Sequence, residues 1–184
     1  MNISYPKNLP ISSKVDEIKS ALYSNQIIIV SGSTGSGKTT QLPKIVLESI
    51  SSSDKKKIAC TQPRRIAATG MARRVAEEME VQYGSTVGCQ IRFDNQTNKD
   101  TIIKFMTDGI LLNEIVHQPL LNDYAAVIID EAHERSLNID FILGYLKNIL
   151  KNRPDLKVII SSATLEAELF SEFFDNAPVI IVEG

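Results

Sequence analysis

The ten residues from Ser31 to Thr40, SGSTGSGKTT, combine glycines, hydroxyl side chains and one lysine in a composition suited to binding phosphate. They contain the pattern Gly32-x-x-x-x-Gly37-Lys38-Thr39, in which backbone N–H groups surround a phosphate chain because glycine adds no blocking side chain. The pattern places Lys38 at the β- and γ-phosphates of ATP and the Thr39 hydroxyl at Mg²⁺. The predicted nucleotide contacts are Gly32, Ser33, Thr34, Gly35, Ser36, Gly37, Lys38, Thr39 and Thr40.

A second chemical candidate is the acidic pair Asp130-Glu131, which directly follows the apolar run 126–129. Asp130 can hold the Mg²⁺ that Thr39 also contacts, and Glu131 can orient or deprotonate an attacking water. Two acids at this position are also typical of a helix N-terminus, where they favour the helix dipole. His133, taken alone, is more often a structural hydrogen-bonding residue than a catalyst.

The elements that must position these residues alternate between strands and helices. The run Ile27–Val30 is entirely β-branched and predicts a strand buried on both faces, and Thr39–Ile50 has helical spacing of apolar residues. Further strands are predicted at 57–61, 102–106, 126–130, 157–161 and 179–182, and further helices at 66–79, 109–117, 138–152 and 166–174. This alternation predicts an α/β fold with a mostly parallel sheet and helices on both faces, whose ligands lie beyond the carboxyl ends of the strands.

Composition is that of an ordinary globular domain. The length of 184 residues suits one domain, and 43% hydrophobic with 23% charged residues is ordinary for a globular protein. The sequence shows neither an apolar run long enough to span a membrane nor a secretory leader. Cys60 and Cys89 stand apart, without metal-ligand spacing, and are expected to be buried thiols. We therefore expect a cytoplasmic protein without membrane contact.

The net charge of −2 argues against general affinity for nucleic acid, although it leaves room for a local basic track. The obvious basic cluster, 55–57, follows Ser51–Asp54 in a predicted surface turn, and a solvated loop is the better interpretation.

Beyond these patterns, Asp130-Glu131-Ala132-His133-Glu134-Arg135 resembles motif II of the DEAH-box helicases of superfamily 2. The resemblance extends to motif I at 32–40, motif Ia at 61–65, motif Ib at 107–109 and motif III at 162–164. Their order and separations resemble the first RecA-like lobe of that family and cover nearly the whole chain. The resemblance implies a RecA-like P-loop NTPase fold over residues 1–184. Within it, residues 1–23 are expected to form a helical lead-in, because Val15, Ile18 and Leu22 have helical spacing. The opening Tyr5-Pro6-x-x-Leu9-Pro10-Ile11 is similar to the bacterial HrpA-type members.

The resemblance also implies which residues touch nucleic acid. Arg64 and Arg65 correspond to a segment that contacts the phosphate backbone, a role that suits fork-shaped donors. Without the other motifs, a surface arginine pair that bridges to acids is the more common interpretation. Thr107 and Asp108 resemble a second backbone contact, and on their own they fit the N-cap of the next helix equally well.

Three further residues are implied to couple the nucleotide site to another lobe: His133, Ser162 and Thr164. Thr164 is also expected to cap the helix at 166–174. Arg74 matches an arginine that stacks against the nucleotide base in related helicases, although its neighbour Arg73 is an alternative and either can be a solvated helix charge.

The sequence also departs from the family pattern. Cys89 stands where an aromatic is common, and Ser161 where many members have an apolar residue, and both are interpreted as packing changes. No Gln-x-x-Gly-Arg-x-Gly-Arg motif occurs, so the arginine fingers and the second RecA-like lobe are absent from this chain. The resemblance implies the ATP-binding lobe of an ATP-dependent RNA helicase. The alternatives are a DNA-directed translocase of the same superfamily and a nucleotide-gated RNA or protein assembly factor that does not unwind.

Overall fold

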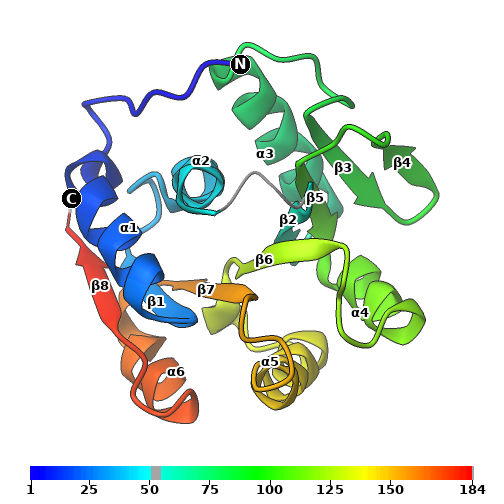
Figure 1. Cartoon of the computed structure of the whole chain (residues 1–184). Coiled ribbons are helices and arrows are strands. Elements are labelled where there is room, and N and C mark those ends of the chain that lie inside the picture. The colour runs from blue at the N-terminus through cyan, green and yellow to red at the C-terminus, as the bar shows by residue number, and fades with distance from the viewer. Residues whose placement is uncertain (51–54, 184) are drawn as a thin grey trace.

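A sheet of eight strands runs through the part of the chain that this computed structural model describes, residues 1–50 and 55–183 (Figure 1). In spatial order the strands are β4 (Asp94–Gln96), β3 (Val87–Ile91), β5 (Ile103–Thr107), β2 (Lys57–Gln62), β6 (Tyr124–Ile129), β7 (Lys157–Ser162), β1 (Ile27–Gly32) and β8 (Val179–Val182). Neighbouring strands are parallel except for the antiparallel pair β3 and β4.

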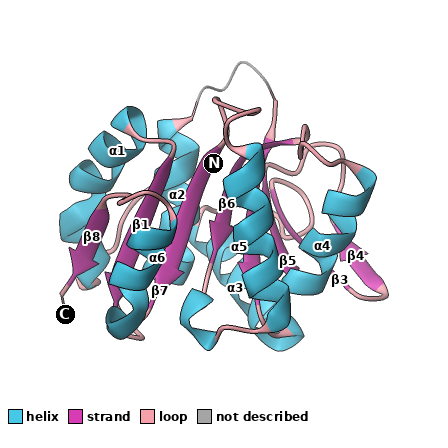
Figure 2. Ribbon diagram, turned by 90° about the horizontal axis from the view of Figure 1, so that it is seen from below, coloured by secondary structure: helices cyan, strands magenta, loops and turns pink. Residues whose placement is uncertain are grey.

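Helices cover both faces of the sheet. The helices are α1 (Val15–Ser24), α2 (Lys38–Ser49), α3 (Arg65–Glu78), α4 (Asp108–His117), α5 (Leu137–Ile149) and α6 (Ala167–Phe173), with short 3₁₀ turns η1 (Pro10–Lys14), η3 (Ala132–Glu134) and η4 (Thr164–Glu166). The first three α-helices pack on one face and the last three on the other (Figures 1 and 2). Successive strand residues point to opposite faces, so Ile28 and Val30 join the first core and Ile29 joins the second. The predicted α/β fold with a mostly parallel, doubly covered sheet is confirmed.

The register of the central strands brings the motifs to one edge. Gln62 of β2 lies beside Thr107 of β5, and Ser31 of β1 lies beside Ser162 of β7. Because these strands are parallel, the residues that follow them emerge together at the carboxyl edge, where ligands of such sheets bind.

The structure corrects the sequence prediction at the β3–β4 edge, because neither strand was expected. β4 is Asp-Asn-Gln and fully exposed, and β3 contains Gly88 and Gln90, so neither carries the apolar run that predicts a buried strand. The other predicted elements agree to within three residues at each end, the largest difference being the helix predicted at 138–152, which ends at Ile149.

The two cysteines, the basic cluster at 55–57 and the length of the helices were also subjects of prediction. Cys60 and Cys89 are free and buried, as predicted. Ser51–Asp54, where a turn was expected, lies outside the described residues, while Lys57 begins β2 and Lys56 pairs with Asp155 at 3.3 Å. Each helix in the described part of the chain is too short or too polar to cross a membrane.

Candidate nucleotide site

The glycine loop lies between β1 and α2 and has the shape of a phosphate cradle. Gly37 precedes the first turn of α2 with φ of 95°, a conformation that disfavours residues with a side chain. A Cβ on Gly37 would also lie 2.9 Å from Cγ2 of Ile11, and the Ile11 N–H donates to the Ser36 carbonyl at 3.0 Å. The lead-in segment therefore braces the loop from behind, a role that the sequence alone did not indicate.

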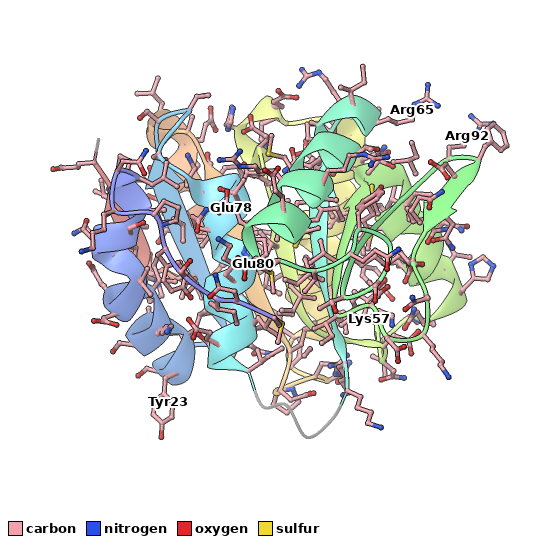
Figure 3. All side chains as sticks on the ribbon, turned by 90° about the horizontal axis from the view of Figure 1, so that it is seen from above. Tyr23, Lys57, Arg65, Glu78, Glu80 and Arg92 are labelled. Carbon is pink, nitrogen blue, oxygen red and sulfur yellow. The ribbon has the colours of Figure 1, made fainter. Side chains whose placement is uncertain are left out.

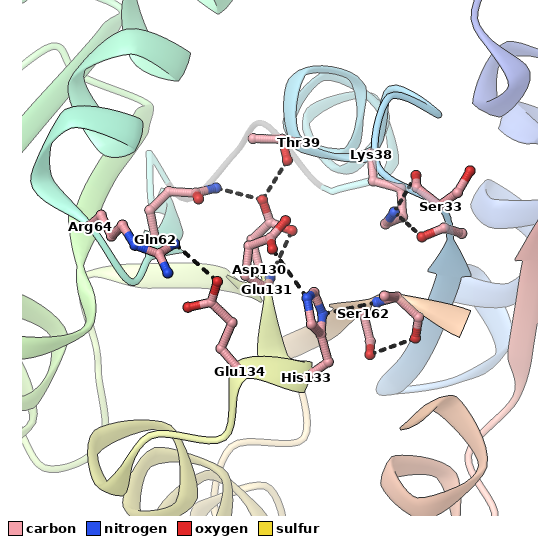
Figure 4. Close-up of polar contacts among 12 residues, drawn as sticks. Ser33, Lys38, Thr39, Gln62, Arg64, Asp130, Glu131, His133, Glu134 and Ser162 are labelled. Carbon is pink, nitrogen blue, oxygen red and sulfur yellow. Dashed lines mark hydrogen bonds and ion pairs between the residues drawn. The ribbon is translucent and has the colours of Figure 1, made fainter. Parts of the chain in front are cut away.

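Lys38 points back into this loop. Its Nζ donates to the carbonyl oxygens of Gly32 at 2.5 Å and Ser33 at 3.1 Å, and to Ser36 Oγ at 3.3 Å (Figure 4). Burial lowers the pKa of Lys38, while the nearby carboxylates of Asp130 and Glu131 oppose that shift. The cation is thus held at the centre of the loop, where phosphate oxygens are expected.

Asp130 follows β6 and is only 3% exposed. Its Oδ2 accepts hydrogen bonds from Thr39 Oγ1 and from Gln62 Nε2, each at 2.5 Å, and its Oδ1 accepts from the Glu131 N–H at 2.9 Å (Figure 4). The contact with Thr39 joins the two predicted Mg²⁺ ligands, although they are 91 positions apart in the sequence.

This donor set fits Mg²⁺. A hydroxyl and a carboxylate oxygen are hard ligands, and Mg²⁺ is typically held by one or two carboxylates together with substrate phosphates. Among the described residues no group of three or more His, Cys, Asp and Glu side chains is arranged to hold a metal ion by itself. The oxygens of Thr39 and Asp130 therefore suit a metal ion that arrives with a phosphate chain, and the Mg²⁺ assignment stays a prediction.

Glu131 has left-handed backbone angles, φ 56° and ψ 34°, which are uncommon for a residue with a side chain and are often found at functional sites. Burial is the main reason that the pKa of its carboxyl is raised, and the charge of Asp130 adds to the effect. A carboxylate with a raised pKa is a better proton acceptor, which suits the predicted base.

His133 connects this acid to motif III. Its Nε2 lies 3.3 Å from Glu131 Oε2, and its Nδ1 lies 3.0 Å from the Ala163 backbone nitrogen. Because the Ala163 N–H can only donate, Nδ1 must accept, so in the neutral ring the proton is on Nε2, facing Glu131. The sequence suggested this link only through the family resemblance.

The other two coupling candidates are placed differently. Ser162 Oγ donates to the Ala163 carbonyl at 2.9 Å. Thr164 begins η4, and α6 starts only at Ala167 with Glu166 in the N-cap position, so the predicted cap of this helix by Thr164 is wrong. The 3₁₀ turn Thr164–Glu166 lies before the helix, so Thr164 is not in its N-cap position. Coupling by Ser162 and Thr164 stays a prediction.

The candidate nucleic-acid contacts lie at the same edge of the sheet. Arg64 is exposed, and its Nη1 pairs with Glu134 Oε1 at 3.0 Å, which is the bridging arrangement considered as the alternative. Arg65 is exposed at the start of α3 (Figure 3). Thr107 occupies the N-cap position of α4 without a side-chain capping bond, and Asp108 is 4% exposed with Oδ1 unpartnered. Backbone contact by these residues stays a prediction.

A cleft of about 390 Å³ opens beside the glycine loop, and Arg64 and Glu131 lie on its wall. Its apolar wall includes Leu9, Ala67 and Met71, none of which the sequence assigned to a nucleotide site. Arg74 follows Met71 by one turn of α3 and pairs with Glu78 at 2.8 Å, whereas Arg73 stacks on Tyr83 with 4.3 Å from its guanidinium carbon to the ring centre. The position of Arg74 one turn after Met71, which lines the cleft, favours Arg74 over Arg73 as the base contact, and this assignment stays a prediction.

A glycine loop between a buried strand and a helix, facing an acid that follows another parallel strand of the same sheet, defines a P-loop nucleotide-binding domain. The family model described as DEAD/DEAH box helicase matches residues 15–171, and the chain belongs to this family. The resemblance drawn from the motifs is thereby confirmed.

Two curated relatives extend the comparison. The chain is 54% identical over 182 residues to the ATP-dependent RNA helicase HrpA of Escherichia coli strain K12. It is also 54% identical over 183 residues to the ATP-dependent RNA helicase HrpA homolog of Haemophilus influenzae. Each match covers 99% of this chain but 14% of the relative, so the chain spans about one seventh of their length.

The burial of Asp108 predicts a pH dependence of stability. Burial, reinforced by the charges of Glu134 and Asp130 and opposed by Thr61, raises the pKa of this carboxyl from 3.8 to about 6. The folded chain therefore binds this proton more tightly than the unfolded chain does. The resulting contribution to the free energy of unfolding is fully present below pH 3.8 and is lost as pH rises through about 6. Relative to Asp108→Asn, the free energy of unfolding should fall by roughly 2–3 kcal/mol across this window.

Urea unfolding of both proteins over a pH series measures this difference, because titrations common to both cancel. A difference that is constant between pH 4 and pH 7 would contradict the assigned burial of the Asp108 carboxyl.

Proposed function

We propose that this chain is the ATP-binding lobe of an ATP-dependent RNA helicase, which couples hydrolysis of Mg-ATP to movement on nucleic acid. The observation that carries the proposal is the 2.5 Å contact between Thr39 and Asp130. It joins the phosphate loop to the acidic motif in the way that metal-assisted phosphoryl transfer requires.

Each residue of the site has a role that its geometry supports. With nucleotide bound, Lys38 would exchange the loop carbonyls for the β- and γ-phosphate oxygens, and Thr39 and Asp130 would hold Mg²⁺. Mg²⁺, when bound, neutralises charge on the phosphate chain. Glu131 accepts a proton from the attacking water, and its raised pKa favours that transfer.

His133 supplies a route from this chemistry to motif III. A change in charge at Glu131 alters its interaction with Nε2, and the same ring holds the Ala163 N–H through Nδ1. We propose that this relay, together with Ser162 and Thr164, reports the state of the nucleotide to the second RecA-like lobe of a longer protein.

The nucleic-acid strand is proposed to cross the carboxyl edge near Arg64 and Arg65, with Thr107 and Asp108 beside it. RNA is favoured over DNA because both relatives are named RNA helicases. Binding of a phosphate by Arg64 must compete with the Glu134 pair, which is exposed and therefore weak.

A second RecA-like lobe is proposed to complete the active site. This sequence contains no motif that would supply arginine fingers, and such a finger contributes about three to five orders of magnitude in rate. The relatives are about seven times longer than this chain, which leaves ample length for that lobe.

The nucleotide assignment is tested by two substitutions in this chain. Lys38→Ala removes the cation that faces the phosphates, so affinity for a fluorescent ADP analogue should fall by at least about tenfold. Glu131→Gln preserves shape and should leave that affinity within about twofold, while in a longer protein that contains both lobes it should lower turnover by roughly a hundredfold or more. Equal losses of ADP affinity in the two variants would contradict this division of roles.

The nucleic-acid assignment is tested by replacing Arg64 and Arg65 together with alanine in the longer, two-lobe protein. Affinity for single-stranded RNA should fall, and the slope of log affinity against log salt should become shallower by up to about 1.4, the release of two counterions. Sequence preference should stay the same because phosphate contacts carry no base information.

The matched control replaces Lys14 and Lys19 with alanine, which removes the same charge from the η1–α1 segment. If both double variants shift the salt slope equally, or neither does, the RNA track lies elsewhere.

A further inference from the structure

The side chain of Gln62 is buried at the end of β2 and lines the cleft beside the glycine loop. It is 3% exposed, and its Nε2 lies 2.5 Å from Asp130 Oδ2. Since a carboxylate only accepts hydrogen bonds, the amide must present its NH₂ group to Asp130. Gln62 belongs to motif Ia at 61–65, but the family resemblance assigned a role there only to Arg64 and Arg65.

Gln62 is one of three donors that fix the orientation of the Asp130 carboxylate. The Glu131 N–H holds Oδ1, while Gln62 and Thr39 both donate to Oδ2 (Figure 4). Two donors on different oxygens determine both the direction and the plane of a carboxylate group.

The three donors are not equivalent when a metal ion binds. Oδ2 has two lone-pair sites, and the hydrogen bonds from Thr39 and Gln62 occupy both, so a cation that binds Oδ2 would take the place of one donor. Thr39 is the donor that is itself a predicted metal ligand, so its hydrogen bond is the one expected to give way. The Glu131 N–H and the Gln62 amide need not change. Gln62 is therefore the side chain that keeps Oδ2 in place as Thr39 changes partner.

The residue type also suits this role. A lysine or arginine in place of Gln62 would neutralise the carboxylate and compete with the metal ion. An apolar residue would leave Oδ2 without this donor. A neutral amide directs the oxygen while leaving its full negative charge available to the cation, as outer partners of metal ligands commonly do.

We propose that Gln62 is a positioning residue for the metal site: it orients Asp130 toward Mg²⁺ without contacting the metal itself. This inference rests on the proposed function, because it takes Asp130 as the metal ligand. It predicts that loss of the amide donor weakens binding of the metal ion and spares the contacts made by the glycine loop to phosphate.

The test is ADP binding by this chain, measured with a fluorescent ADP analogue in EDTA and over a Mg²⁺ titration. Gln62→Met keeps the length and volume but removes the donor. The Mg²⁺ concentration at which half of the metal-dependent change in ADP binding has occurred should rise roughly tenfold. An effect of this size is usual when a residue that hydrogen-bonds a metal ligand is lost. ADP affinity in EDTA should stay within about twofold of the unsubstituted chain.

The matched control is Gln26→Met, the same substitution at a glutamine whose Nε2 donates to the Leu150 carbonyl at 2.9 Å, far from the site. It should leave the Mg²⁺ midpoint unchanged, whatever it does to thermal stability. If Gln62→Met does not fold, Gln62→Asn provides the same test, because the shorter amide cannot reach Asp130 without a backbone shift.

A Mg²⁺ midpoint within twofold of the unsubstituted chain would overturn the inference. Equal losses with and without Mg²⁺ would overturn it as well, because they would show a general effect on the cleft. If the unsubstituted chain binds no ADP, the proposed function itself is wrong, and the role of Gln62 is lost with it.

Discussion

The carboxylate of Asp130 is the point at which the functional segments of this domain meet. Its oxygens accept hydrogen bonds from Thr39 at the start of α2, from Gln62 at the end of β2 and from the N–H of Glu131. Thr39 and Gln62 lie far from Asp130 in the sequence and reach it only because β2 and β6 pair in parallel register, with α2 packed nearby. The parallel sheet is therefore the constraint on which the site depends.

Several polar groups of the site have protein partners that a ligand could replace. The Lys38 ammonium donates to loop carbonyls, the Thr39 hydroxyl donates to Asp130, and the Arg64 guanidinium pairs with Glu134. A phosphate can accept hydrogen bonds from Lys38 and Arg64, and a metal ion can bind the oxygen of Thr39. Until then, the current partners avoid the cost of leaving these donors unpaired. We propose that binding is an exchange of partners and that the hydrogen bond from Gln62 to Asp130 stays in place during the exchange.

Much of this arrangement could be predicted from the sequence because the strongest signals are local. The β-branched run Ile27–Val30, the glycine loop and the apolar spacing of the next helix define a strand, a loop and a helix without any tertiary information. What could not be predicted depends on contacts across the fold. The bracing of Gly37 by Ile11, the donor role of Gln62 and the burial of Asp108 arise from packing between distant segments. β4 was missed because Asp-Asn-Gln becomes a strand only by pairing with β3.

We propose that this chain carries a complete nucleotide-binding site but only part of a catalytic one. The most direct test measures ATP turnover and ADP binding by the purified chain, with and without single-stranded RNA. We expect saturable ADP binding that Mg²⁺ tightens. ATP turnover should be close to background and should hardly increase when RNA is added. Robust ATP hydrolysis stimulated by RNA in this chain alone would contradict the claim.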